Sequence, residues 1–177
     1  MVELELYHIT CKAYPIGKVP PLEGESLHHL TTQTDVKAWI NDFLDLYRSN
    51  EVPSRKKTFF ACDSIMNCKA LKSTVAKANC TPRIYKVKMK SPSKLPLALV
   101  NHLFVLGQGH TKNIELANEY WNPTKNWNFY EYLSEEMEII EEVINEDLTP
   151  MGQVRFWVSD NCNLIADSEL VKAIFVK

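Results

Sequence analysis

The chain has 177 residues, of which 45% are hydrophobic and 24% charged, a size and balance typical of one compact domain with its own core. Its formal net charge is −2, with acids and lysines mixed along the chain, so the composition gives no support for a nucleic-acid partner. No apolar run approaches the length of a membrane span and the acidic first residues are unlike a signal peptide, so we expect a soluble, cytoplasmic protein without membrane contact.

The chain opens on a predicted strand, a loop and a helix. Apolar and polar residues alternate from Val2 to Ile9, which predicts a strand whose apolar face ends at His8. Residues 11–32 hold three prolines and two glycines and are expected to form a long loop. Apolar residues then recur at i, i+3, i+4 spacing over residues 36–47, which predicts an amphipathic helix.

A second strand and a second helix are predicted next. Lys57–Cys62 is predicted as a short strand, and Asp63 is well placed to cap a helix over residues 64–78. Over residues 83–90 the apolar side chains share one face and lysines share the other. This alternation predicts an antiparallel strand that is buried on one side.

The last part of the chain is predicted to hold two short helices within 95–121, a polar loop over 122–128, and strands at 136–144, 151–158 and 170–176. Antiparallel strands interrupted by helices, without strict βαβ alternation, favour an α+β fold. With only five glycines in the chain, neither a Rossmann turn nor a P-loop is expected. We predict one α+β domain that spans the whole chain.

The five cysteines have irregular spacings, with no C-x-x-C pair and no histidine at zinc-finger distance. We interpret them as reduced thiols in a cytosolic setting. No metal-ligand spacing is visible, so no metal site is expected.

Three short motifs follow one another along the chain: Leu6-Tyr7-His8-Ile9-Thr10, Thr58-Phe59-Phe60-Ala61-Cys62-Asp63, and Glu131-Tyr132-Leu133 before the apolar run Met137-Glu138-Ile139-Ile140. Their order and rough spacing resemble the ADP-ribosyltransferase superfamily, in its His-Tyr-Glu clade with diphtheria toxin and the poly-ADP-ribose polymerases. The resemblance covers nearly the whole chain, and its weight lies in the order because each motif is only a few common residues. It implies a split, mainly antiparallel β-sheet core with flanking helices, and NAD as the substrate.

By this resemblance Glu131 is the candidate catalytic residue. Cleavage of the bond between nicotinamide and ribose passes through an oxocarbenium-like sugar, and a carboxylate in a site that excludes water stabilises that charge. His8 would orient the adenosine-side ribose. Ile9 and Thr10 would complete the NAD contacts of the first motif, and Phe60 would stack on the nicotinamide.

Three further residues are assigned by position. Arg55 lies just before the second motif, where its guanidinium could meet the pyrophosphate of NAD. Trp127 and Phe129, in an aromatic loop before Glu131, are candidate contacts of the acceptor. Superfamily members that modify arginine tend to carry a second glutamate where Phe129 stands, so the resemblance implies a non-arginine acceptor, expected on a protein.

The resemblance has one departure. The clade usually places a tyrosine in the second motif to stack on the nicotinamide, and here Phe60 stands there, while Leu71 stands where a second tyrosine often occurs. A phenylalanine ring can still stack because stacking uses the ring face. The departure affects the expected pose of NAD and the efficiency of the reaction.

Each residue also has a structural interpretation. A histidine at the end of an apolar strand is more often a satisfied edge residue than a ligand contact. Glu131 belongs to an acid-rich stretch of the kind that usually forms a solvated face, and Arg55 adjoins two lysines in what is more often a solvated cluster.

Two classes of function follow. The first is an active mono-ADP-ribosyltransferase, such as a toxin, an effector delivered into a host cytosol or a phage-encoded modifier of host proteins. The second is a degenerate member that binds a nucleotide or a protein partner without chemistry, since fold alone does not establish function. NAD hydrolysis and RNA 2′-phosphate transfer are narrower options, and the net negative charge counts against an RNA substrate.

Overall fold

The computed structural model describes residues 2–22, 38–71, 81–127 and 129–143. Antiparallel pairing builds two three-stranded sheets from these residues. The first sheet has the order β1 (Glu3–Thr10), β3 (Arg83–Lys90), β6 (Met137–Val143). The second has the order β2 (Phe59–Ala61), β5 (Tyr130–Ser134), β4 (Ser93–Pro96).

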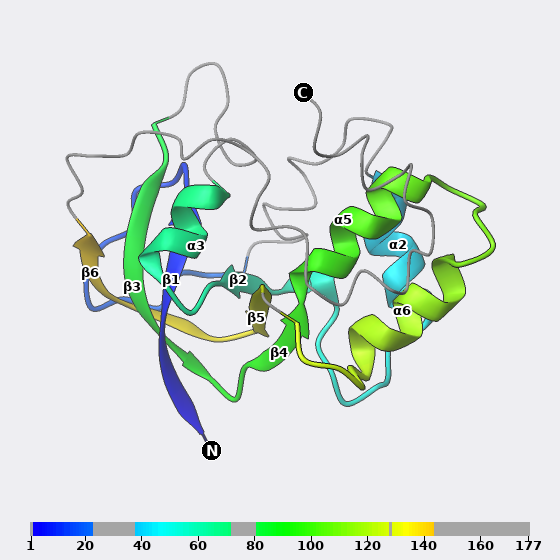
Figure 1. Cartoon of the computed structure of the whole chain (residues 1–177). Coiled ribbons are helices and arrows are strands. Elements are labelled where there is room, and N and C mark those ends of the chain that lie inside the picture. The colour runs from blue at the N-terminus through cyan, green and yellow to red at the C-terminus, as the bar shows by residue number, and fades with distance from the viewer. Residues whose placement is uncertain (1, 23–37, 72–80, 128, 144–177) are drawn as a thin grey trace.

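Four α-helices and one 3₁₀ turn lie within the described residues: α2 (Ala38–Leu46), α3 (Ile65–Ala70), α5 (Leu97–Leu106), α6 (Asn113–Trp121) and the turn η1 (Arg55–Lys57). Helices α2, α5 and α6 gather on one side of the molecule and the β1-β3-β6 sheet lies on the other, with the short strands β2, β4 and β5 between them (Figure 1). The α+β prediction is therefore confirmed, with two small antiparallel sheets.

The two sheets are joined where β1 meets the end of β2. Tyr7 and Cys62 form an antiparallel bridge, in which the Tyr7 amide donates to the Cys62 carbonyl at 2.8 Å and the Cys62 amide donates to the Tyr7 carbonyl at 2.7 Å. The bridge brings the first and second motifs together, although they are far apart in the sequence.

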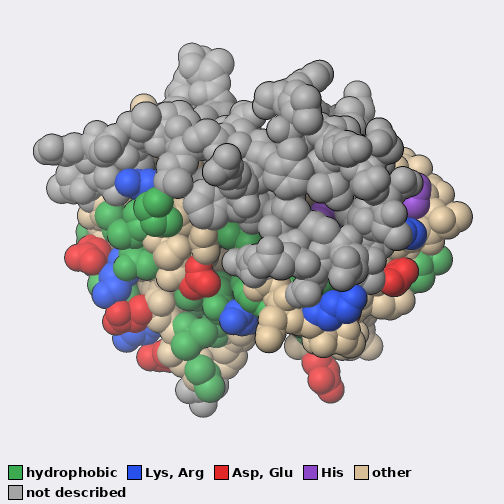
Figure 2. Space-filling model, in the orientation of Figure 1, with side chains coloured by type: hydrophobic (Ala, Val, Ile, Leu, Met, Phe, Trp, Pro, Cys, Tyr) green, Lys and Arg blue, Asp and Glu red, His purple; other side chains and the backbone are tan. Residues whose placement is uncertain are grey.

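Strand β3 has the one-sided burial that its sequence predicts. Tyr85, Val87 and Met89 are fully buried, and lysines occupy the alternate positions. Lys86 forms an ion pair with Glu5 across the β1–β3 pairing at 2.7 Å. Charged side chains of both signs accordingly lie among hydrophobic ones on this side of the molecule (Figure 2).

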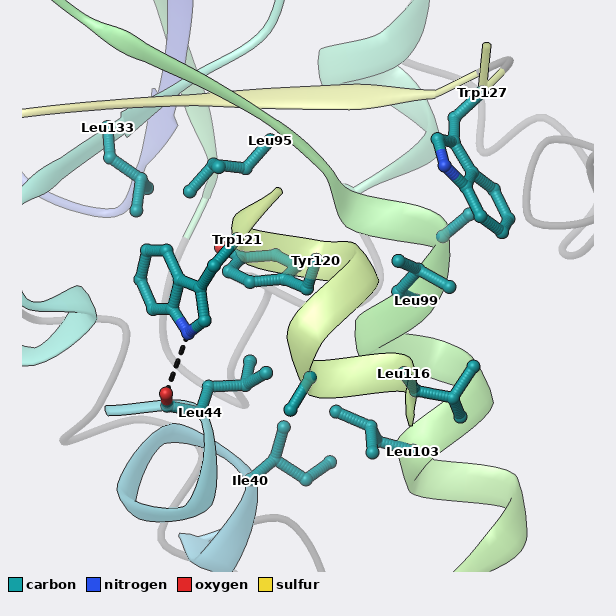
Figure 3. Close-up of a cluster of buried hydrophobic side chains, with 12 residues drawn as sticks. Ile40, Leu44, Leu95, Leu99, Leu103, Leu116, Tyr120, Trp121, Trp127 and Leu133 are labelled. Atoms are coloured by element: carbon teal, nitrogen blue, oxygen red, sulfur yellow. Dashed lines mark hydrogen bonds between the residues drawn. The ribbon is translucent and has the colours of Figure 1, made fainter. Parts of the chain in front are cut away.

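The largest group of buried side chains packs between the helices and the second sheet. We call it the helical cluster, and its buried members are Ile40, Leu44, Leu95, Ala98, Leu99, Leu103, Leu116, Ala117, Tyr120, Trp121, Trp127 and Leu133. Figure 3 shows the Trp121 ring against α2, where its Nε1 donates to the Leu44 carbonyl at 2.7 Å. Helices α2 and α6 are therefore held together by packing and by one buried hydrogen bond.

A second group of buried side chains lies between the two sheets. We call it the sheet cluster, with the buried members Leu6, Phe59, Ala61, Tyr85, Val87, Met89, Tyr132, Met137 and Ile139. Tyr130 of β5 packs against both clusters. Strand β5 is thus the element through which the two halves of the core meet.

Several element boundaries differ from the prediction. Glu131 lies inside a strand, β5, and not in a loop before one, and β4 was not predicted. The run that was predicted as a strand from Lys57 begins with the turn η1, because the Ser54 hydroxyl caps it by accepting from the Lys56 amide. The cap of α3 is Ser64 and not Asp63.

Some predictions lie outside the described residues. These are the strands at 151–158 and 170–176, the end of the helix predicted to Ala78, and the later part of the loop over residues 11–32. The described start of that loop lies along β6, where the Gly17 amide donates to the Ile139 carbonyl at 2.8 Å and the Ile139 amide donates to the Lys18 carbonyl at 3.0 Å.

Candidate functional site

His8 lies on β1 with one ring nitrogen tied to the second sheet. Its Nδ1 is 2.6 Å from the Phe60 carbonyl oxygen, and because a carbonyl only accepts, Nδ1 carries the proton. Nε2 is then an acceptor, and it is buried without a hydrogen-bond partner in the part of the chain that the structure describes. Burial lowers the pKa of His8 to about 4, although the bond to Phe60 acts in the opposite direction. The neutral ring therefore presents a bare acceptor nitrogen.

The aromatic residues of the second motif divide between core and site. Phe59 is buried in the sheet cluster, with its ring edge-on to His8 at a centroid distance of 6.5 Å. Phe60 is half-buried, and the Arg55 guanidinium carbon lies 5.0 Å from its ring centroid. The ring that was predicted to stack on nicotinamide thus has a cation–π contact with Arg55.

The other two residues of the first motif are held by neighbouring structure. Thr10 is buried, and its hydroxyl accepts from the Lys12 amide at 3.2 Å, which closes a local turn. Ile9 is half-buried and packs against a small cluster that includes Cys62, Cys68 and Phe129. Ile9 therefore lies beside the bridge that Cys62 forms with Tyr7.

Glu131 and Arg55 form a buried ion pair. Arg55 is 0% exposed and Glu131 is 3% exposed, and the Arg55 Nη1 donates to the Glu131 Oε1. The Tyr120 hydroxyl donates to the same oxygen at 2.6 Å and also contacts Arg55 Nη1. The Arg55 Nε donates to the Asn41 Oδ1 at 2.9 Å. Residues from η1 and α6 therefore converge on one carboxylate oxygen of the β5 residue Glu131, and Asn41 of α2 holds Arg55 in place.

Charge dominates the electrostatics of this group. Burial alone would lower the pKa of Arg55, but the charge of Glu131 and the contacts with Tyr120 outweigh it and raise the pKa. Burial also raises the pKa of the Tyr120 hydroxyl well above its ordinary value. Arg55 is thus a fixed cation beside Glu131, and Tyr120 is a neutral donor.

The two oxygens of Glu131 differ. Oε1 accepts from both Arg55 and Tyr120, whereas Oε2 makes no hydrogen bond with the described residues. Oε2 is also not one of the polar atoms that are fully buried without a partner in that part of the chain. One oxygen is anchored and the other is left for a further contact.

The predicted acceptor residues lie in the interior. Trp127 is buried, and its Nε1 donates to Glu119 Oε1 at 3.0 Å. Phe129 is 1% exposed and packs beside Cys62 and Cys68. Both residues support the polypeptide that leads into β5, and neither presents a surface to a macromolecule in this conformation.

The structure brings the main predicted residues together through Phe60. Its carbonyl binds His8, its ring contacts Arg55, and it pairs in register with Leu133, two residues after Glu131. The predicted contact of Arg55 with pyrophosphate is not the contact seen, because Arg55 is buried against Glu131.

Sequence reasoning missed Tyr120, Asn41 and Glu119. Tyr120 and Asn41 hold the ion pair, and Glu119 holds the loop after α6. Each is a common polar or aromatic residue on a helix, and no motif distinguishes it from its neighbours. Only the folded chain identifies them.

The thiol prediction needs a correction. Cys62 and Cys68 are free and buried, as expected, and the hydrogen bond with Cys68 together with burial raises the pKa of the Cys62 thiol. Cys11 is disulfide-bonded, so the expectation that all five cysteines are reduced is wrong at that position.

A surface pocket of about 750 Å³ lies beside η1 and the turns that follow β3 and β5. It contains none of the predicted site residues. Its charged lining is balanced, with Arg48, Lys56, Lys57 and Lys90 against Asp45, Glu51, Glu135 and Glu136. The pocket therefore favours neither an anionic nor a cationic ligand.

Neither a metal site nor a membrane span is found in the described residues. They contain no group of three or more histidine, cysteine, aspartate or glutamate side chains that could hold a metal ion. None of the described helices is long and apolar enough to cross a membrane.

Comparisons with known proteins assign no family. No protein-family model matches the chain, and no curated protein matches it. The resemblance to the ADP-ribosyltransferase superfamily therefore depends on the three motifs.

Proposed function

We propose that this protein is a mono-ADP-ribosyltransferase of the His-Tyr-Glu clade, which moves ADP-ribose from NAD to a non-arginine side chain of a protein. One observation carries the proposal: the three motifs meet on adjoining strands. His8 of β1 binds the carbonyl of Phe60 in β2, and β2 pairs with β5, which holds Glu131.

The polar atoms of the site suit the proposed chemistry. The bare Nε2 of His8 accepts a hydrogen bond, as a ribose hydroxyl requires. Oε2 of Glu131 is not anchored, and a carboxylate beside the ribose stabilises positive charge that develops as the bond to nicotinamide breaks. Nicotinamide leaves with the bonding electron pair, and the acceptor nucleophile then attacks the sugar carbon and loses its proton.

The test is incubation of the protein with isotopically labelled NAD, alone and with cell lysate. The Glu131→Gln variant is the matched control, because it keeps the size of the side chain and removes its charge. We expect nicotinamide release and a mass increase of one ADP-ribose on a lysate protein, at sites other than arginine. Release without any modified acceptor would instead indicate an NAD hydrolase.

A second function is favoured by the burial of the ion pair. Glu131 is 3% exposed and already neutralised by Arg55, as in a purely structural salt bridge. This observation favours a degenerate module that binds a nucleotide or a protein without chemistry. Calorimetric titration with NAD separates the two functions: binding without nicotinamide release would support the degenerate module, and release would exclude it.

A further inference from the structure

Two side chains outside the three motifs act on the same oxygen of Glu131. The Tyr120 hydroxyl donates to Oε1 at 2.6 Å from α6, and the Arg55 guanidinium donates to it from η1. The side chain of Glu131 comes from β5, so three separate elements fix its position. A carboxylate held at one oxygen has its other oxygen set in a defined direction.

Arg55 is itself fixed on several sides. Its Nε donates to Asn41 of α2 at 2.9 Å, and its guanidinium carbon lies 5.0 Å from the Phe60 ring centroid and 5.3 Å from that of Tyr120. A planar guanidinium with these neighbours cannot rotate without losing several contacts. The position of Glu131 is therefore tied through Arg55 to those of α2 and β2.

Stability alone does not account for this group. Removing two charges from water is costly, and proteins with well-packed apolar residues in place of a buried ion pair are often as stable or more stable. The helical cluster around Tyr120 already supplies a large apolar core. An arrangement that costs free energy and fixes one carboxylate oxygen is suited to orienting that carboxylate.

We propose that Tyr120 and Arg55 are positioning residues for Glu131, and that they aim its Oε2 at the ribose. This inference rests on the proposed transferase function and adds to it. Tyr120 and Arg55 act through Glu131 and do not contact the reacting atoms. Their removal should therefore lower kcat and leave the KM for NAD nearly unchanged.

The first experiment compares Tyr120→Phe with the parent protein by nicotinamide release, well below the melting temperature of either. The variant removes one hydroxyl and keeps the buried ring. We expect kcat to fall about 10²-fold, as a displaced catalytic group typically causes. Tyr85→Phe is the matched control, because Tyr85 is also fully buried and its hydroxyl accepts from the Tyr14 amide at 3.1 Å, away from Glu131. Its kcat should stay at the parent level even if its melting temperature falls.

The second experiment repeats Tyr120→Phe in a Glu131→Gln background. If Tyr120 acts through the carboxylate, its loss should cost about twofold or less once the charge is gone, because residues that act as a unit are not additive. The same large loss in both backgrounds would overturn the inference. So would a parent-level kcat for Tyr120→Phe.

Arg55→Lys provides a second variant that keeps the positive charge and loses the planar fork. A folded Arg55→Lys protein should also lose kcat, with an unchanged KM for NAD. If the parent protein neither releases nicotinamide nor modifies an acceptor, the proposed function is wrong and the positioning roles are wrong with it. If the parent is active and both variants match it, only the positioning roles are wrong.

Discussion

Glu131 is the residue on which the two proposed functions differ most. In a transferase its charge acts on the cationic transition state, and in a degenerate module it only satisfies Arg55. Oε1 of Glu131 is anchored by Arg55 and Tyr120, and Oε2 is not. A substitution that removes the charge of Glu131 but keeps its shape therefore distinguishes the two functions.

Glu131→Gln should lower NAD turnover by roughly 10² to 10³, the usual cost of one electrostatic contact with a transition state. Affinity for NAD should change far less, because such a contact contributes little to ground-state binding. Turnover is measured by nicotinamide release and affinity by calorimetry. Turnover at the parent rate would rule out the catalytic role.

Two histidines, the half-buried His8 and the buried His102, make folding stability depend on pH. Burial lowers the pKa of His8 to about 4, with the Phe60 carbonyl opposing the shift, and burial lowers the pKa of His102 to about 4 as well. In the unfolded chain both titrate near 6.5. Between these values the unfolded chain binds protons that the folded chain does not, so the free energy of unfolding falls as the pH decreases from about 6.5 toward 4.

Urea unfolding at several pH values in this window tests the effect. Each histidine contributes a slope of up to about 1.4 kcal/mol per pH unit. His102→Gln should reduce the slope relative to the parent, because one titrating group is removed. An identical slope in both proteins would show that His102 does not titrate as proposed.

At the level of elements, Glu119 holds the loop between α6 and β5 in place through hydrogen bonds. Its carboxylate accepts from the Thr124 amide at 2.9 Å, the Thr124 hydroxyl at 2.7 Å, the Lys125 amide at 3.2 Å and the Trp127 Nε1 at 3.0 Å. Burial would raise the pKa of Glu119, but these bonds outweigh it and lower the pKa. The loop is therefore organised around one ionised side chain.

Glu119→Gln should destabilise the fold by about 1–3 kcal/mol, because donors that now meet a charge would meet a neutral amide. Glu115→Gln is the control, since Glu115 lies on the exposed face of the same helix, and it should change stability by less than about 0.5 kcal/mol. Both values come from denaturant unfolding. Equal effects for the two variants would show that the Glu119 bonds contribute nothing.

At the level of the whole molecule, β5 joins the helical cluster to the sheet cluster. Tyr130 packs against both, and β5 pairs with β2 on one side and β4 on the other. We therefore expect the two clusters to unfold together as one domain.

Leu103→Ala tests this cooperativity. Leu103 is fully buried in the helical cluster, and its truncation should cost about 2–5 kcal/mol, whereas Leu46→Ala at a 79% exposed position should cost less than about 0.5 kcal/mol. In a single cooperative unit, the free energy of unfolding should fall by the same amount whether it is measured by hydrogen exchange of the β3 amides or by tryptophan fluorescence. Unchanged protection of β3 would indicate two independent units.

The sequence alone determined much of the local structure. Alternation predicted β1 and β3, and i, i+3, i+4 spacing predicted α2, because these periods follow from the geometry of strands and helices. A strand was also predicted over 136–144, where β6 lies. In β1 the apolar face is buried only in part, since Leu6 is buried whereas Val2 and Leu4 are exposed. The sequence did not predict β5, since Tyr130–Ser134 is buried nearly throughout and has no alternation to read.

Only the tertiary structure decided which polar residues meet. Arg55 lies 65 residues before Tyr120 and 76 before Glu131, and the sequence pattern favoured solvated charges for Arg55 and Glu131. The pairing of β5 with β2 and the packing of α2 and α6 bring them to one buried point. Periodicity in the sequence indicates which residues of a helix or strand share a buried face. A contact between side chains of different elements depends on how those elements pack, and local spacing carries no information about that packing.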